Sequence, residues 1–463
     1  MDREESDADL LRGAAPMTPG YQLVRTVIRL LLRLFYRRID VVGRERIPAT
    51  GPVLAVANHH NSIVDAMQVV MLFQRPVMVL ANAPLFRHPL IGPFLRMMHA
   101  VPVSRRVEAG DDPKKNEAMF AAAIGVLRGG GVLLIFPEGR TQPQPTLLPV
   151  RTGAARILLG AETAAGGRCG ITLLPLGMVF HDPGTFRSAS VQIMVGEPVP
   201  TADVIAAYPE HPADVVRELT ARIADAIRAR IVEAEDHYTL ELLDVLERAW
   251  FQEATRPGAA EQALSWKQRV MRGARYLAER EPHRVAALRR RVELYCAHLD
   301  EVGVPSEQLG RPYTPGLVVR YVVENLVWLA LGLPLALWGL ACHALPYWLT
   351  GKTVALLGRT AEEEATDKMA AGLVLYPMCW ALEAWLVWRL AGLALFLTFL
   401  LAVIPSGVLA LAWRERLGDV GRQARAFVWF LTDRDLHRRL LQERRALVDE
   451  ARALGDLVPP HAG

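Results

Sequence analysis

The chain has 463 residues, which is longer than one typical domain, so we expect two or three units. Its formal net charge of +4 is mild and comes with neither a long basic tract nor a known nucleic-acid-binding module, so we expect no nucleic-acid partner. A small positive charge fits attraction to an anionic membrane surface better. Four widely spaced cysteines match no metal-ligand pattern, so we expect small buried thiols and no metal site: Cys169, Cys296, Cys342 and Cys379.

A basic amphipathic helix is predicted at 21–38, after a polar N-terminus. Arginine recurs there at every fourth position, and apolar residues fill the opposite face; the arginines are Arg25, Arg29, Arg33 and Arg37. This pattern is typical of a helix lying in the plane of a bilayer surface. An ordinary helix packed on its own domain is the alternative.

Residues 39–201 show the pattern of an α/β domain. Short, continuous apolar runs end in polar or glycine-containing turns and alternate with helical stretches; the runs are 53–56, 77–80, 100–103, 132–136, 171–176 and 191–195. Continuous apolar strands indicate a sheet covered on both faces. Ligand chemistry then belongs at the carboxyl ends of the strands.

The rest of the chain is predicted to be helical. Residues 202–312 are highly charged and carry no site signature, so they read as a helical extension. Three apolar stretches follow within 313–463, at 326–349, 369–388 and 390–413, before an arginine-rich tail. The last two are long enough to form a spanning hairpin over 369–413. We expect 326–349 to be re-entrant or interfacial, because three full spans would separate the tail from the α/β domain.

Two short motifs point to chemistry. The first, Asn58 to Asp65, sets two histidines ahead of an aspartate, and the second, Phe136 to Thr141, contains Glu138, Gly139 and Arg140 just after an apolar run. A histidine held by a carboxylate can act as a general base on a hydroxyl group. An arginine beside a glycine at the open end of a strand suits a phosphate.

In this order and separation the two motifs resemble those of the glycerolipid acyltransferase superfamily, which transfers fatty acyl groups to glycerol phosphates and lysophospholipids. The resemblance covers residues 40–200 or so. The family's usual motif, a histidine four residues before the aspartate, selects His60 and Asp65. A variant form with the histidine directly after asparagine selects His59. We favour His59 because the Asn-His pair directly follows a predicted strand, and we keep His60 as the alternative.

The resemblance also implies a phosphate clamp. The block Ala100 to Arg105 resembles a family segment in which an arginine helps to hold the acceptor phosphate, although Ser104 stands where aspartate or glycine is common. Arg105 and Arg140 would be the two clamping residues, and Glu138 would bind a substrate hydroxyl or hold Arg140. The runs 147–155, 186–188 and 196–199 resemble a subgroup that includes glycerol-3-phosphate acyltransferases.

The sequence therefore predicts an α/β acyltransferase domain with a helical extension and a C-terminal α-helical membrane region. The expected reaction moves an acyl group from acyl-CoA or acyl-carrier protein, a co-substrate, to glycerol 3-phosphate or 1-acylglycerol 3-phosphate, with no cofactor. Membrane lipids are expected partners, and the catalytic domain is expected to face the cytoplasm, since no signal peptide is seen. The alternatives are remodelling of lysophospholipids and a membrane scaffold with a lapsed site.

Overall fold

The computed structural model describes residues 17–87, 91–103, 113–182, 184–251, 259–303, 309, 315–357, 363–433 and 435–459. The chain forms two compact units. The first comprises residues 1–237 with 360–369, and the second comprises 238–359 with 370–463.

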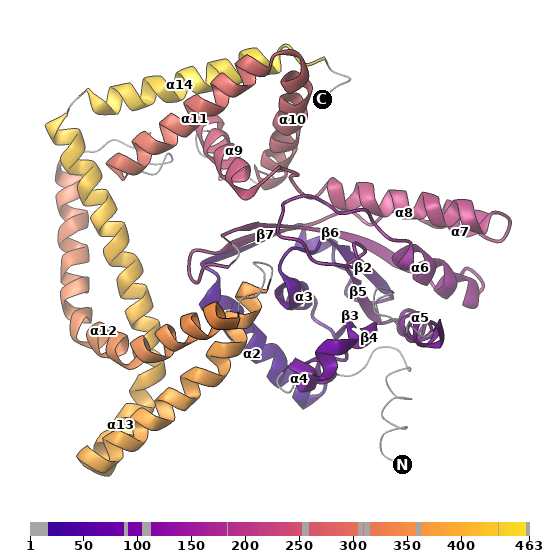
Figure 1. Cartoon of the computed structure of the whole chain (residues 1–463), viewed down its shortest axis with the longest axis horizontal. Helices are drawn as coiled ribbons and strands as arrows, with labels where there is room; N and C mark the ends of the chain where they lie inside the picture. Colours follow the sequence, from indigo (N-terminus) through magenta and orange to yellow (C-terminus); the bar gives the residue numbers. More distant parts are fainter. Residues whose placement is uncertain are drawn as a thin grey trace. The chain divides into compact units, whose positions relative to one another are not determined.

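The first unit is built on a seven-stranded sheet with the order β1-β7-β6-β2-β5-β3-β4 (Figure 1). Its strands are β1 (Arg38–Val42), β2 (Val53–Ala57), β3 (Val77–Asn82), β4 (Val101–Val103), β5 (Val132–Ile135), β6 (Thr172–His181) and β7 (Ser190–Val195). All neighbouring pairs are parallel except β6 and β7. The six apolar runs in the sequence therefore are strands, as predicted, and β1 is an additional edge strand.

Both faces of this sheet are buried, as the continuous apolar strands predicted. Successive residues of β2 point to opposite faces, so that Val53 and Ala55 join one core cluster while Leu54 and Val56 join the other. Helices α2 (Pro19–Phe35) and α3 (Ser62–Val70) cover the first face. The second face is covered by α5 (Pro113–Arg128), α6 (Gly153–Ala164) and α8 (Pro212–Arg228). The shorter helices are η1 (Arg44–Arg46), η2 (Ala83–Arg87), α4 (Ile91–Met97) and α7 (Ala202–Ala207).

Helix α2 corrects the expected membrane-surface helix at 21–38. It ends at Phe35, and its apolar face is buried in the core of its own unit through Tyr21, Val24, Ile28, Leu32 and Phe35. An amphipathic pattern predicts that one face of a helix packs against an apolar partner, but it does not show whether that partner is a sheet or a bilayer. The face left in solvent carries Arg29 and Arg33, with Leu23 and Leu30 as exposed apolar side chains, whereas Arg25 is half-buried and donates to the Phe73 carbonyl.

The first unit also extends beyond the expected boundary at 201. Helix α8 has an apolar stripe, including Leu219, Ile223 and Ile227, that is fully buried against the second face of the sheet. Removing such a stripe from water stabilises the fold by about 25 cal/mol per Å² of apolar area. The charged residues of 202–228 lie on the side of the helices that faces away from the sheet, which is why the sequence suggested a separate extension.

The second unit is helical. It contains α9 (His237–Trp250), α10 (Ala259–Arg280), α11 (Pro282–Val302), α12 (Pro315–Leu357) and α14 (Leu436–Gly455), together with most of α13 (Glu364–Thr432). Two of its helices are long and apolar enough to cross a membrane, over Val319–Leu357 and Glu364–Trp429. Helix α13 breaks at Gly392, whose φ of 82° turns the chain within the predicted hairpin at 369–413.

Candidate active site

Both motifs lie at the carboxyl edge of the sheet because their strands are neighbours. Strand β2 leads into the first motif and β5 leads into the second, and the two pair in parallel with Val56 opposite Ile135. Carboxyl ends of parallel neighbours meet at the same edge, so His59 and Glu138 come together although 79 positions separate them.

The ring of His59 is held by Asp65. Nδ1 of His59 lies 2.8 Å from Oδ2 of Asp65, which is fully buried in the first turn of α3. A carboxylate accepts but cannot donate a hydrogen bond, so Nδ1 carries the proton and Nε2 has a free lone pair. The His59 ring also stacks on Phe136, with 4.1 Å between centroids. Its side chain remains 15% exposed, which leaves it open to a substrate.

The ring of His60 has a different partner. Its Nδ1 lies 3.1 Å from the carbonyl oxygen of Gln142, and only its backbone N–H reaches Asp65, at 2.7 Å. Burial lowers the pKa of His60, more than the nearby Asp65 raises it, which favours the neutral ring. The structure therefore brings His59, and not the His60 ring, into contact with Asp65.

Asp65 is fixed from several directions. Oδ2 also accepts the backbone N–H of Asn61 at 2.8 Å, so three N–H groups converge on one oxygen. The Asn61 amide in turn donates to the hydroxyl of Tyr36 at 2.9 Å, and burial raises the pKa of that tyrosine. Such a network holds the carboxylate in one orientation before any substrate arrives.

Glu138 points inward and binds backbone. Its Oε1 accepts the N–H of His59 at 2.7 Å and its Oε2 accepts the N–H of Leu148 at 2.8 Å. Burial raises the pKa of Glu138 to about 7, against the lowering effect of those two amides. Both carboxylate oxygens are thus occupied within the protein, and Glu138 links the two motifs to each other.

Arg140 is exposed beside Gly139, whose φ is 71°. A Cβ at Gly139 would stand 3.0 Å from Cδ and from Nε of Arg151, so the Arg151 side chain lies directly over this glycine. The other predicted clamp residue, Arg105, lies outside the described residues, and its placement stays a prediction.

Several contacts of the site have no counterpart among the sequence predictions. The amide of Asn58 pairs with both backbone groups of Met178, at 2.8 Å and 2.7 Å, and so locks the end of β2 to β6. The loop after the second motif is held by Gln142, whose N–H donates to the His59 carbonyl at 3.2 Å. Glu233 and His237 fasten the same loop through Leu147 and Pro143.

Comparison with known proteins agrees with this geometry. Residues 38–179, which include both motifs and six of the seven strands in whole or in large part, match the family model Acyltransferase. The chain carries an acyltransferase domain of the glycerolipid acyltransferase superfamily.

Three curated relatives illustrate the similarity. An uncharacterized acyltransferase of Schizosaccharomyces pombe is 23% identical over 62% of this chain and 55% of its own length. Glycerol-3-phosphate O-acyltransferase 2 of Saccharomyces cerevisiae is 28% identical over 42% of this chain and 26% of that protein. A 1-acyl-sn-glycerol-3-phosphate acyltransferase of Bacillus subtilis is 26% identical over 47% of this chain and 97% of that enzyme. The chain thus spans about half or less of the two fungal relatives.

Proposed function

We propose that this protein is a membrane-bound O-acyltransferase that uses a glycerol phosphate or a 1-acylglycerol phosphate as acceptor. The observation that carries the proposal is the contact of His59 Nδ1 with Asp65 at 2.8 Å, at the sheet edge where the arginine motif also lies. The named relatives act on these two acceptors, which supports the same substrate class here.

The chemistry follows from the tautomer of His59. Its Nε2 takes the proton of an acceptor hydroxyl as that oxygen attacks the carbonyl carbon of an acyl thioester. Asp65 stabilises the imidazolium that forms. When the tetrahedral intermediate collapses, the C–S bond breaks and the proton passes from Nε2 to the leaving thiolate. An ester and a free thiol result, and no covalent enzyme intermediate is needed.

The acceptor phosphate would lie beside Gly139, where Arg140 is exposed. A guanidinium presents a fork of donors that matches two phosphate oxygens. Because Glu138 is occupied by backbone amides, its charge is not placed to compete with the phosphate as a direct ligand of Arg140. Glu138 therefore acts as a link that positions the two motifs, and its charge attracts Arg140.

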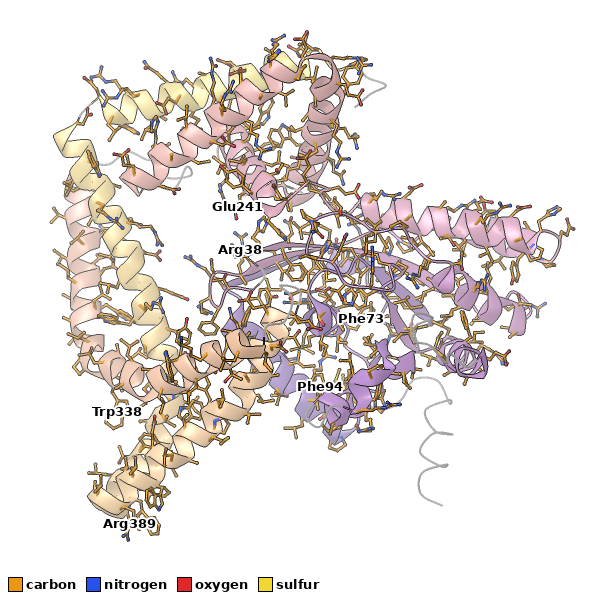
Figure 2. All side chains as sticks on the ribbon, viewed as in Figure 1. Arg38, Phe73, Phe94, Glu241, Trp338 and Arg389 are labelled. Atoms are coloured by element: carbon orange, nitrogen blue, oxygen red, sulfur yellow. The ribbon has the colours of Figure 1, made fainter. Side chains whose placement is uncertain are left out.

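The membrane anchor would be the two arms of α13. They pack antiparallel about Gly392, with Trp388 against Phe396 and Ala384 in one cluster with Phe399. Figure 2 shows Arg389 at the tip of this turn. The apolar lengths of both arms match a hydrocarbon core roughly 30 Å thick.

Helix α12 would be re-entrant, with both ends on the side of the catalytic unit. Near its start, Asn325 Oδ1 accepts from Arg416 at 2.6 Å and the Leu329 carbonyl accepts from Trp413 at 2.8 Å, so this end meets the C-terminal end of the second arm. Its other end, Leu357, lies seven positions before Glu364, the start of the first arm. Both ends then share one side of the bilayer.

Between those ends the helix reaches partway down the hairpin. Trp338 contacts Phe399 with 6.2 Å between ring centroids, and Figure 2 shows Trp338 at the bend of α12. Pro334 and Pro346 lie inside the helix and remove backbone hydrogen bonds, which permits such a bend. Two crossings in total place the arginine-rich tail and the catalytic unit on the same side.

An acceptor panel tests the proposal. The full-length protein in detergent is incubated with labelled acyl-CoA or acyl-carrier protein and with glycerol 3-phosphate, 1-acylglycerol 3-phosphate or lysophosphatidylcholine. We expect transfer to a phosphate monoester with at least one donor. Faster transfer to lysophosphatidylcholine would favour the remodelling alternative, and no transfer to any acceptor would contradict the proposal.

A further inference from the structure

We propose that Arg151 is a further phosphate-binding residue of this site, which completes with Arg140 a two-guanidinium clamp around Gly139. This inference rests on the proposed function and deepens it, because it assigns the site to phosphate monoesters over phosphodiesters. Arg151 lies 11 positions after Arg140, beyond the motif that holds the other candidate residues.

Local geometry brings the Arg151 side chain back to the motif. The backbone N–H of Arg151 donates to the carbonyl of Pro137 at 2.8 Å, so the chain returns to the motif after the loop. The guanidinium then lies over Gly139, with Cδ and Nε 3.0 Å and Cζ 3.3 Å from the place of a Cβ. Any larger residue at 139 would meet it.

The charge of Arg151 has no acidic partner in the part of the chain that the structure describes. No carboxylate among the described residues pairs with its side chain, and Glu138, the acid of the neighbouring motif, already binds the N–H groups of His59 and Leu148. Arg151 is exposed, as is Arg140. Two exposed cations, one next to Gly139 in the chain and one lying over it, favour an anion from solution.

The position suits an acceptor that reacts at His59. The backbone N–H of His59 is bonded to Glu138, the residue before Gly139, so the clamp and the base are tied to one short segment. A phosphate beside Gly139 would let a hydroxyl four or five bonds from the phosphorus reach toward the ring of His59. A dianionic monoester gains more from two guanidinium groups than a phosphodiester with a single charge.

The test compares Arg151→Ala, Arg151→Lys and Arg156→Ala in the full-length protein. Arg156 is also exposed, one turn into α6, and is the matched control. With the donor that supports transfer in the wild type, we expect Arg151→Ala to raise the KM for glycerol 3-phosphate roughly 10- to 100-fold. The KM for the donor should stay unchanged. The preference for monoester over lysophosphatidylcholine should fall, and Arg151→Lys should lie in between.

Direct binding of glycerol 3-phosphate by calorimetry gives a readout that does not depend on turnover. It should weaken in Arg151→Ala and not in Arg156→Ala. If acceptor KM and binding stay within about twofold of the wild type, or if the donor KM rises instead, Arg151 is not an acceptor ligand. Those outcomes differ from failure of the proposed function, in which the wild type itself acylates no phosphate monoester.

Discussion

Nδ1 of His59 and Oδ2 of Asp65 are 2.8 Å apart, and that same oxygen also accepts the backbone N–H groups of His60 and Asn61. The aspartate therefore fixes both the tautomer of the base and the backbone that carries it. Because all three bonds meet on one atom, a change at position 65 disturbs the ring orientation and the loop together.

Asp65→Asn should lower kcat by roughly 10²- to 10⁴-fold. An amide carries no charge to stabilise the imidazolium, even where its oxygen takes the place of Oδ2 and accepts the same three N–H groups. Steady-state transfer with saturating acceptor measures the loss, and circular dichroism checks that the protein is folded. A folded variant that keeps a tenth of the rate or more would show that Asp65 does not act through the base.

Glu138→Gln should remove a pH dependence of stability. Burial raises the pKa of Glu138 from its usual 4.5 to about 7. A raised pKa means that the folded state holds the proton more tightly, so the associated stability is full below the unfolded pKa and lost as pH rises through about 7. Between pH 5 and 8 the free energy of unfolding of the wild type should therefore fall relative to that of the variant.

Thermal unfolding in detergent at several pH values provides this comparison. Gln should also weaken one of the two backbone bonds, because it has only one acceptor oxygen, at a cost of about 1–3 kcal/mol. Parallel pH profiles for the two proteins would contradict the titration of Glu138 in this range.

Gly139→Ala tests the close approach of Arg151. The change adds strain from a φ of 71°, about 1–2 kcal/mol, and a methyl group 3.0 Å from Cδ of Arg151. The matched control is Gly130→Ala, because Gly130 has a φ of 80° and nothing within 4 Å of its Cβ position. Both variants should lose stability through the φ strain, whereas only Gly139→Ala should raise the KM for the acceptor. If the acceptor KM is the same in Gly139→Ala and Gly130→Ala, Arg151 does not contribute to the acceptor site.

The proposed membrane anchor can be tested by extraction from the membrane and by the side from which single cysteines are labelled. The full-length chain should stay in the membrane after carbonate and high-salt washes. In a background without the four native cysteines, an impermeant maleimide should label Arg389→Cys from one side and Asp449→Cys from the other. Labelling of both from the same side would contradict a hairpin that spans the bilayer.

The sheet and the paired motifs were predictable from local patterns. Apolar runs such as 53–56 mark buried strands, and adjacent parallel strands bring their carboxyl ends together. The edge strand β1 was missed because its residues are half-buried or exposed and carry no apolar run. Helix α2 was predicted at nearly the right position, but its partner was wrong, because an apolar stripe fits a sheet as well as a bilayer.

The inward orientation of Glu138 and the contact of Arg151 with Gly139 could not be predicted from the sequence, for another reason. Glu138 binds the N–H of His59, 79 positions away, and Arg151 reaches Gly139 only after a loop held by Gln142 and Glu233. No periodic pattern of residues in the sequence predicts either contact. They depend on the folded loop, which local propensity does not encode.

The role of His59 as the base can be tested by comparing His59→Ala with His60→Ala in a single-turnover transfer assay with labelled acyl donor and saturating glycerol phosphate acceptor. We expect His59→Ala to lower the rate by roughly 10²- to 10⁴-fold. His60→Ala should lower it far less, because its ring contacts the Gln142 carbonyl and not Asp65. Equal mild losses in both variants, or a larger loss in His60→Ala, would contradict the role of His59 as the base.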